Sequence, residues 1–445
     1  MTSNLPKKRW AVVGGGILGM TLAHRLQSAG QDVTILERAD HLGGMADAWE
    51  FGPYVWDRHY HVTLLSDLHL RGLLRELSLE EDMVWKETKT GFYTDGSWYS
   101  MSNSLEFLRF PPLHLLDKFR LGATIFYASK LKDWKRLEGI PVADWLTRLS
   151  GERVFEKMWL PLLKAKLGES YTKTSAAFIW AIIARMYAAR QSGLKKEMFG
   201  YLTGGYDRFL TTFSRRLEED GVTIQCGSTV QEIRKTDRGF CIMAANEEEK
   251  TFDQVVTTMP SPLAASTCID LTPIEREQLR EVEYQGIVCA SVLLKKPVQG
   301  YYVTNITDTW VPFTAIIEMT SLVDPENFGG NTLVYLPKYV SPDDPLFDED
   351  DASIKERFIE ALLAMNPHLR PDDVLSFQVS RERRVLALST LNYSSRLAPM
   401  KSSVEGLFIV NSSQIYQGTL NVNETIQLAH RAMDEVLLPE QNDSA

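Results

Sequence analysis

Three glycines near the N-terminus, Gly14, Gly16 and Gly19, constrain the fold of this chain more than any other feature. They follow an apolar run, Arg9 to Val13, that is typical of a buried strand, and they open a segment whose leucines recur at helical spacing. A G-x-G-x-x-G pattern between a strand and a helix favours dinucleotide binding. The first glycine makes the turn, the second lets the backbone approach a pyrophosphate, and the third lets the helix pack closely. The phosphates would then lie at the positive end of the helix.

An acidic residue in the expected place completes the pattern. The second predicted strand, Asp32 to Leu36, is followed by Glu37, about 20 residues after the glycines, where a carboxylate accepts hydrogen bonds from a ribose 2′-hydroxyl. A 2′-phosphate would be repelled there, so the sequence disfavours NADP. A glycine-rich turn in another α/β unit is the alternative, and the flanking strand, helix and acid make it the weaker one.

Composition bounds the size and class of the protein. The chain has 445 residues, of which 44% are hydrophobic, enough for two or three cores in one composite enzyme. A net charge of −10 argues against nucleic acid as a partner. The four cysteines show neither metal-ligand nor disulfide spacing, so we expect free thiols and no metal site. No apolar leader or membrane-spanning run is evident, so we expect a cytoplasmic protein without a transmembrane segment, and peripheral membrane contact stays open.

A second glycine pair, Gly43-Gly44, follows the acid, and Met45 comes next. A flavin dinucleotide is long enough to use a second close backbone approach. With these motifs the chain resembles the superfamily of FAD-dependent amine oxidases, protoporphyrinogen oxidases and phytoene desaturases, although that family often has Arg where this chain has Met45. The resemblance implies FAD as the cofactor. It also implies contacts to FAD from Gly14, Gly15, Gly16, Leu18, Gly19, Glu37, Arg38, Gly43, Gly44, Met45, Val230, Asn411, Leu420, Asn421 and Val422.

Two later segments belong to this implied cofactor site. In the resembling family, the strand equivalent to that around Val230 offers backbone hydrogen bonds to adenine; generic strand packing is the alternative. A strand near the C-terminus ends in Gly-Asp in the family, whereas this chain has Asn411-Ser412, whose neutral amide can still bond a ribityl hydroxyl. The helix that begins near Leu420 is implied to point its positive end at the pyrimidine end of the flavin.

One histidine is the candidate catalytic residue. His61 lies in an aromatic-rich segment, and a comparable segment passes beside the flavin ring in flavoproteins resembling protoporphyrinogen oxidase or UDP-galactopyranose mutase. A hydrogen-bonded core histidine is the alternative. We expect the pocket that His61 faces to be lined by apolar residues, including Trp159 and the stretch Phe178 to Ile183.

The order of predicted elements favours an α/β fold. We expect an FAD-binding Rossmann-type, doubly wound domain built from discontinuous segments, with a mixed α+β substrate domain and a helical insertion. The expected boundaries are 1–95, 200–275 and 380–445 for the FAD-binding domain, 96–199 for the helical insertion on the substrate side, and 276–379 for the sheet of the substrate domain.

The leading functional hypothesis is an FAD-dependent oxidoreductase, either an oxidase, a dehydrogenase or a desaturase. It would transfer hydride from a small, lipophilic organic substrate to the flavin N5. Lys164 and Lys166 are candidates for holding an anionic group, but solvated lysines beside a core helix are favoured over that role. Two alternatives stay open, a non-redox flavoenzyme resembling UDP-galactopyranose mutase and a non-catalytic flavin-binding protein.

Overall fold

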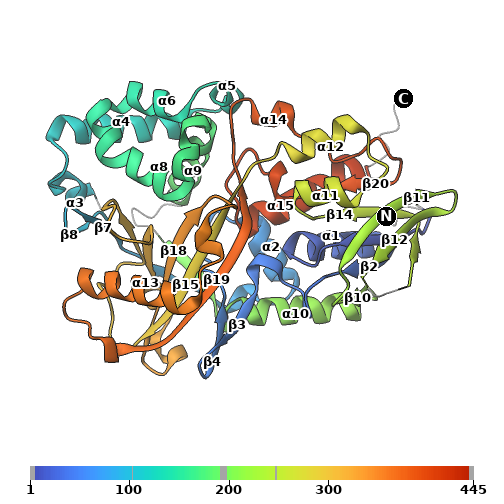
Figure 1. Cartoon of the computed structure of the whole chain (residues 1–445), viewed down its shortest axis with the longest axis horizontal. Helices are drawn as coiled ribbons and strands as arrows, with labels where there is room; N and C mark the ends of the chain where they lie inside the picture. The colour runs from blue at the N-terminus through green and yellow to red at the C-terminus, as the bar shows by residue number, and fades with distance from the viewer. Residues whose placement is uncertain (1–5, 103, 191–197, 246–247, 440–445) are drawn as a thin grey trace.

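The computed structural model describes residues 6–102, 104–190, 198–245 and 248–439 (Figure 1). Its first layer is a five-stranded parallel sheet in the order β10-β2-β1-β14-β20. In the central strand, Val12 pairs with Ile35 on one side and with Val256 on the other. The sheet therefore assembles strands from distant parts of the chain, as predicted. Their bounds are β1 Arg9–Val13, β2 Asp32–Leu36, β10 Thr223–Gln225, β14 Gln254–Thr257 and β20 Leu407–Ile409.

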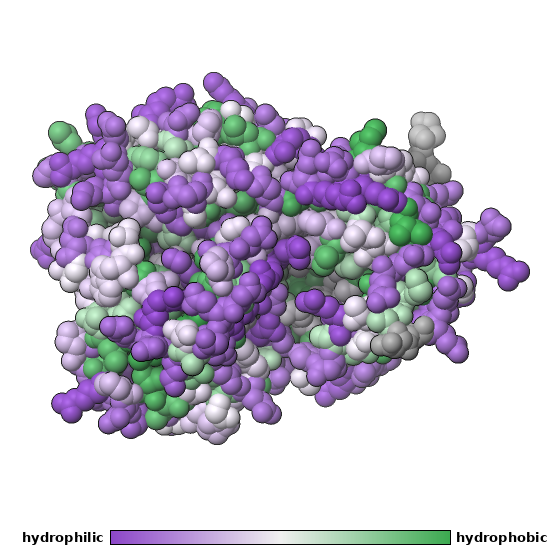
Figure 2. Space-filling model, in the orientation of Figure 1, coloured by the Kyte–Doolittle hydropathy of each residue, from purple (hydrophilic) through white to green (hydrophobic). Residues whose placement is uncertain are grey.

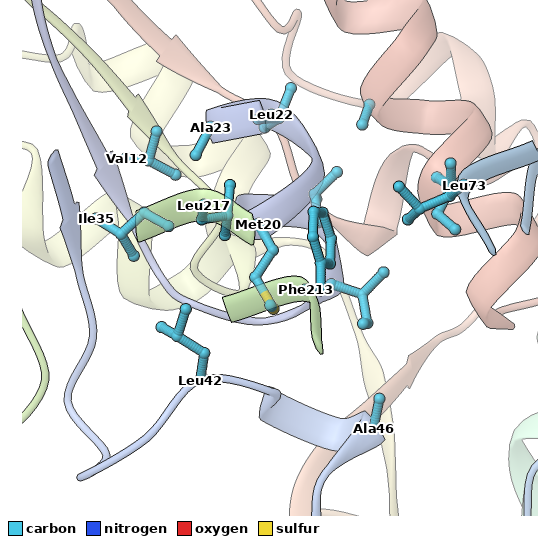
Figure 3. Close-up of a cluster of buried hydrophobic side chains, with 14 of the residues drawn as sticks. Val12, Met20, Leu22, Ala23, Ile35, Leu42, Ala46, Leu73, Phe213 and Leu217 are labelled. Atoms are coloured by element: carbon cyan, nitrogen blue, oxygen red, sulfur yellow. The ribbon is translucent and has the colours of Figure 1, made fainter. Parts of the chain in front are cut away.

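Both faces of this sheet are covered by other elements. Successive side chains of β1 point to opposite faces, so this strand contributes to the core on each side. Trp10 and Val12 join a cluster with α1, α2, α10 and α15, part of which Figure 3 shows. Ala11 and Val13 join a second cluster with the antiparallel sheet β11-β12-β13 and with α11 and α12. The predicted doubly wound fold is confirmed. The bounds are α1 Ile17–Ser28, α2 Leu68–Glu76, α10 Gly205–Glu219, α15 Val422–Ala432, β11 Val230–Thr236, β12 Gly239–Ala244, β13 Lys250–Phe252, α11 Ser261–Thr267 and α12 Pro273–Arg280.

A seven-stranded sheet forms the second layer, in the order β19-β15-β18-β17-β16-β7-β8. Every residue of β15 is buried, and α13 packs on one face of the sheet. The hairpin β7–β8 turns at Asp95-Gly96, both with positive φ, as an Asp-Gly pair predicts. The bounds are β7 Thr90–Thr94, β8 Ser97–Ser100, β15 Tyr284–Leu294, β16 Val303–Ile306, β17 Ala315–Glu318, β18 Thr332–Val340, β19 Val374–Ala387 and α13 Asp351–Met365.

The strands of this sheet depart from the expected domain boundaries at three places. β7 and residues 380–387 of β19 lie in the seven-stranded sheet, although the sequence placed both in the FAD-binding domain, and β8 lies there although the sequence placed it in the helical insertion. β7 is recruited by parallel pairing with β16, more than 200 residues later in the chain, and β19 by antiparallel pairing with β15. Pairings of this range leave no local pattern in the sequence.

A block of helices fills residues 104–190, as the apolar spacing predicts, and lies at the upper left of Figure 1. Trp159 is buried in the core of this block, where its Nε1 donates a hydrogen bond to Ser150 Oγ at 3.0 Å. Phe178, Ile179 and Ile183 are buried in the same core. The helices are α3 Ser104–Arg109, α4 Leu115–Lys130, α5 Trp134–Glu138, α6 Val142–Ser150, α7 Glu152–Val154, α8 Leu160–Leu167 and α9 Ala176–Arg190.

Short elements join the layers. Aromatic residues of β4 and β9 pack against β15 and β18, so the segment after β4 lies beside the seven-stranded sheet. Figure 2 shows a recess between β19 and the half of the molecule that contains the parallel sheet. Within the described ranges, no helix is long and apolar enough to cross a membrane. The remaining bounds are β3 Ala48–Phe51, β4 Tyr54–Asp57, β5 Thr63–Leu64, β6 Met83–Glu87, β9 Met198–Leu202 and α14 Tyr393–Arg396.

Candidate functional site

The first glycine loop, Gly14–Gly16, connects β1 to α1, and the helix packs closely against the loop. Gly14 has φ +108°, and its N–H donates to Leu36 O at 2.9 Å, which ties the turn to β2. A Cβ on Gly19 would overlap the carbonyl oxygen of Gly14, so only glycine lets α1 approach the loop this closely. Gly16 differs, because the atom nearest to a Cβ there would be Gly44 Cα at an ordinary 3.8 Å. The loop is therefore tightly packed at Gly14 and Gly19 but open at Gly16.

The second glycine pair packs directly on the first loop. Gly43 N–H donates to Gly15 O at 2.9 Å, and a Cβ on Gly44 would lie 3.0 Å from Gly16 Cα. Gly43 and Gly44 have φ of +140° and +60°, which other residues rarely adopt. The two motifs thus pack together, with Gly14 and Gly16 half-buried and Gly44 exposed. We call Gly14–Gly16 together with Gly43–Gly44 the glycine cradle.

Glu37 lies at the edge of this cradle. Its Oε2 accepts from Gly15 N–H at 2.6 Å and its Oε1 from Ala39 N–H at 2.9 Å. The carbonyl of Glu37 accepts from Ser228 N–H at 2.8 Å, which brings the chain leading into Val230 beside the acid. The acid and the adenine-side strand inferred from the sequence are therefore close together in space.

Three other residues of the implied cofactor set differ in exposure. The side chain of Leu18 is buried in the core beneath the parallel sheet, so only its backbone can face a ligand. Arg38 is exposed, and Met45 is half-buried just beyond the cradle.

The structure corrects the interpretation of Asn411. Its Nδ2 donates to Met259 O at 2.9 Å and to Ser261 Oγ at 3.2 Å, and its Oδ1 accepts from the N–H and Oγ of Ser413 at 3.0 and 2.7 Å. This buried amide has no capacity left for a ribityl hydroxyl. Asn411 instead shapes the loop that follows β20, and any contact to a cofactor there falls to its neighbours.

The N-terminus of α15 lies where the core of the parallel sheet meets the helical block and β19, a region that we call the junction. Asn421 caps the helix, with Oδ1 accepting from Glu424 N–H at 3.1 Å. Leu420, just before the cap, packs against the core of the helical block. Val422 begins the helix and is half-buried. Burial raises the pKa of the Glu424 carboxyl, one turn into the helix.

His61 lies where β4, α10 and the second sheet meet. Its Nδ1 is 3.5 Å from Asp57 Oδ2, and its ring centroid is 4.4 Å from that of Tyr206. Asp57 is held in place, because its Oδ1 accepts from Tyr206 N–H at 2.7 Å and its carbonyl accepts from Tyr335 Oη at 2.6 Å. His61 Nδ1 is buried without a hydrogen-bond partner among the described residues. The ring borders a cavity of about 10 Å³, the size of one water molecule, and neither Trp159 nor the stretch 178–183 lines it.

The two histidines of this segment have different surroundings. His59 Nε2 and Ser380 Oγ are 2.9 Å apart, so β19 holds this ring. Burial, followed by the nearby His61 and Arg58, lowers the pKa of His59 to about 3. His59 is therefore neutral at physiological pH. The segment is not a strand, so strand alternation does not place the two rings on one face.

Sequence reasoning missed the groups that tie this segment to the second sheet. Arg58 donates to Ser380 Oγ at 3.1 Å and to Glu382 Oε1 at 2.6 Å. Tyr60 and Tyr339 share a hydrogen bond of 2.9 Å between their hydroxyls, and burial followed by Tyr339 raises the pKa of Tyr60. The partners are about 280 to 320 residues apart, and no spacing in the sequence connects them.

Of the two candidate lysines, only one reaches this junction. Lys166 Nζ lies 3.7 Å from the centroid of the Tyr339 ring, a cation–π contact. Lys164 pairs with Glu169 at 3.0 Å on the exposed side of α8, as expected of a solvated lysine. The described residues contain no cluster of three or more His, Cys, Asp or Glu that could hold a metal ion.

The residues present fit a dinucleotide. The cradle offers backbone at the point where a Cβ on Gly16 would fill the space, the positive end of α1 faces it, and Glu37 lies at its edge. A sequence profile described as flavin containing amine oxidoreductase matches residues 19–437. The chain belongs to this family. The predicted flavin cofactor and the predicted class, a flavin-dependent oxidoreductase, are confirmed at the level of the family.

Individual relatives are distant. Coproporphyrinogen III oxidase of Staphylococcus aureus is 24% identical over 285 residues, which are 57% of this chain and 60% of that protein. Zeta-carotene desaturase of Synechocystis sp. is 23% identical over 412 residues, 81% of this chain and 83% of the relative. The match to the coproporphyrinogen oxidase thus spans about three fifths of that enzyme.

Solved structures share the fold over nearly the whole chain. A putative protoporphyrinogen oxidase from Exiguobacterium sp. has a TM-score of 0.76 at 16% identity, covering 97% of this chain and 99% of that one. Reduced UDP-galactopyranose mutase has a TM-score of 0.72 at 14% identity, covering 97% and 94%. At such identities the likeness establishes the fold alone.

Proposed function

We propose that this protein is an FAD-dependent oxidoreductase that takes hydride from a small, largely apolar organic substrate. The observation that carries the proposal is the glycine cradle with Glu37 at its edge, next to a junction walled by aromatic side chains. The cradle suits a pyrophosphate and the acid suits a ribose, which together favour FAD over FMN. Bound FAD supplies the hydride acceptor.

We further propose which residues hold the cofactor. Gly14 and Gly19 shape the loop, Gly16 and Gly44 offer their backbone, and the first turn of α15 directs its positive end at the flavin. His61 would lie beside the ring, where Asp57 and Tyr206 fix its orientation. The buried Nδ1 of His61 is 3.5 Å from Asp57 Oδ2, so this carboxylate is the group that can orient the ring.

An apolar substrate fits the electrostatics of the junction. Arg58 is neutralised by Glu382, His59 is neutral at physiological pH, and Lys166 lies over an aromatic ring. These groups do not make a basic site for a nucleotide diphosphate. The name of one relative adds support, because zeta-carotene is an apolar hydrocarbon polyene.

We also propose a cytoplasmic location. The cysteines Cys226, Cys241, Cys268 and Cys289 are all free in the structure, and three of them are buried. Unpaired thiols are typical of a reducing compartment. Comparing the labelled protein with compartment markers in cell fractions tests this.

The decisive experiment is anaerobic spectroscopy of the purified protein. It should be yellow and release FAD on denaturation, and porphyrinogens, polyenes or amines should bleach it where nucleotide sugars do not. His61→Ala should retain FAD yet be reduced roughly 100-fold more slowly, the usual cost of losing a positioned proton-transfer group. His368→Ala, an exposed histidine, is the matched control.

Three results would overturn the proposal. A colourless protein that takes up no FAD would refute the cofactor assignment. Turnover of a nucleotide sugar by dithionite-reduced protein, without net redox change, would establish the mutase alternative. Unchanged reduction of the His61→Ala protein by its substrate would remove His61 from the reaction.

A further inference from the structure

The outer face of α4 exposes large apolar side chains along its whole length. Leu116 is 78% exposed, Phe119 64% and Phe126 58%, and Leu115 and Tyr127 are exposed beside them. These positions recur at intervals of three, four and seven residues, so they form one stripe on the helix. We call this set the α4 stripe.

The opposite face of the same helix is already buried. Leu121, Thr124 and Ala128 face the core of the helical block, against α6 and α9. The apolar stripe is therefore not the core face of a loosely packed helix. Ile274, 74% exposed on α12, is a single exposed apolar side chain, as is normal for soluble proteins, and Leu105 and Leu108 form a smaller exposed pair on α3.

The segment around the stripe carries a net positive charge, opposite in sign to the net charge of the whole protein. Residues 104–136 contain seven Lys and Arg against three Asp and Glu, whereas the whole protein has a net charge of −10. Asp117 is buried and pairs with Arg153 at 3.3 Å, so it adds little negative potential outside. Among the basic residues, the following are exposed: Arg109, Arg120, Lys130, Lys132, Lys135 and Arg136.

The basic groups lie close to the stripe. Arg120 is next to Phe119 in the chain, and Lys130 Nζ lies 5.6 Å from the ring centroid of Phe126. A helix with apolar side chains outward and lysine or arginine along its flanks is the usual design for lying in the interface of an anionic bilayer. A neutral partner would leave the basic flank unmatched.

We propose that the α4 stripe is a docking surface for an anionic membrane, with the α4 helix lying in the headgroup region. Leucine and phenylalanine enter the boundary of the acyl chains, and the flanking basic residues contact the lipid phosphates. Docking would hold the helical block against a membrane, which is a source of lipophilic molecules. The surface stands on its own residues and does not depend on the proposed reaction.

Vesicle flotation of the full-length, flavin-loaded protein tests the proposal. With vesicles of phosphatidylcholine containing about 30% phosphatidylglycerol, the protein should float with the lipid. With vesicles of pure phosphatidylcholine, much less protein should float. Raising the salt concentration should weaken the binding. Leu116→Asp should lower the apparent affinity about tenfold or more, because it removes an inserted apolar side chain and adds a repelled charge.

Matched variants separate docking from general effects. Ile274→Asp removes an equally exposed apolar side chain on another helix and should bind vesicles like the wild type. Lys130→Glu/Lys132→Glu should weaken binding to anionic vesicles, whereas Lys355→Glu on α13 should not. Because the readout is flotation, these results do not depend on any enzymatic activity.

Two outcomes would overturn the proposal. Equal flotation of wild type and Leu116→Asp protein would show that the stripe does not touch lipid. A wild type that sediments as a dimer and fails to bind vesicles, with Leu116→Asp monomeric, would show that a second copy of the chain covers the stripe instead. Sedimentation velocity without vesicles makes that distinction.

Discussion

Gly16 and Gly19 are three residues apart and meet different demands. Gly19 is required by the fold, because a methyl group there would overlap the carbonyl of Gly14. Gly16 has room for a methyl group in the protein itself, with Gly44 Cα 3.8 Å away. We therefore propose that Gly16 keeps the space beside it open for a ligand.

This contrast gives a prediction at the scale of single residues. Gly16→Ala should leave the free energy of unfolding within about 1 kcal/mol of wild type and yet abolish stoichiometric FAD binding. Gly19→Ala should lower the free energy of unfolding by about 1–3 kcal/mol, as overpacking does. Denaturant unfolding and the ratio of flavin to protein absorbance measure both effects. Full FAD content in Gly16→Ala would contradict this role.

Asn411 shows how a residue predicted as a ligand can have a structural role. From the sequence, its amide could bond either the cofactor or the protein. The fold surrounds it with Ser261, Ser413 and the carbonyl of Met259, which use all its hydrogen-bonding capacity.

At the scale of elements, α15 joins the parallel sheet to the rest of the proposed flavin site. It packs against α1, and its capped N-terminus lies beside the helical block. β20 and α15 supply buried residues of the main cores, so removing the chain from Gly406 onward would unfold the protein. Substitutions at the cap are the sharper probe of this helix.

Asn421 supplies a pair of such substitutions. Asn421→Ala removes the bond to Glu424 N–H and should lower the free energy of unfolding by about 1 kcal/mol. Asn421→Asp restores the cap and should restore stability. Its added negative charge at the helix N-terminus should shift the flavin midpoint potential to more negative values, because reduction adds negative charge to the ring. A potential unchanged in Asn421→Asp would place α15 away from the flavin.

At the scale of the whole molecule, one short segment connects the two layers. Arg58 and His59 leave β4 and bond Ser380 on β19, and Arg58 also bonds Glu382. The pKa of His59 is about 3 in the folded protein and near 6.5 in the unfolded chain. Folding therefore favours neutral His59, and this contribution is complete above pH 6.5 and is lost as the pH falls toward 3.

The lowered pKa of His59 should make the stability of the protein sensitive to acid. Between pH 7 and pH 5 the His59 contribution to the free energy of unfolding should fall by about 2 kcal/mol. His59→Gln, which stays neutral, should lose this part of the pH dependence, and His368→Gln should retain it. Urea unfolding of all three proteins at both pH values measures the difference. Parallel pH profiles for wild type and His59→Gln would contradict the buried, neutral state of His59.

Features that depend on residues close together in the chain could be predicted before the structure was known. The strand, glycine turn, helix, acid and second glycine pair occupy residues 9–45, where spacing alone sets backbone conformation and close approach. The same holds for the Asp95-Gly96 hairpin and for the helical block. The doubly wound fold followed from these local patterns, and the flavin and the class of enzyme followed from the family resemblance that the motifs carry.

Features that depend on contacts between distant residues could not be predicted in this way. β7 and the end of β19 joined the second sheet through pairing with distant strands. The amide of Asn411 formed all its hydrogen bonds within the protein. Arg58, His59 and Tyr60 bonded strands about 280 to 320 residues later. Packing also turned one apolar stripe of α4 outward. Periodicity shows that a side chain is apolar or polar, but which surface it meets is settled by packing between elements that the linear sequence keeps far apart.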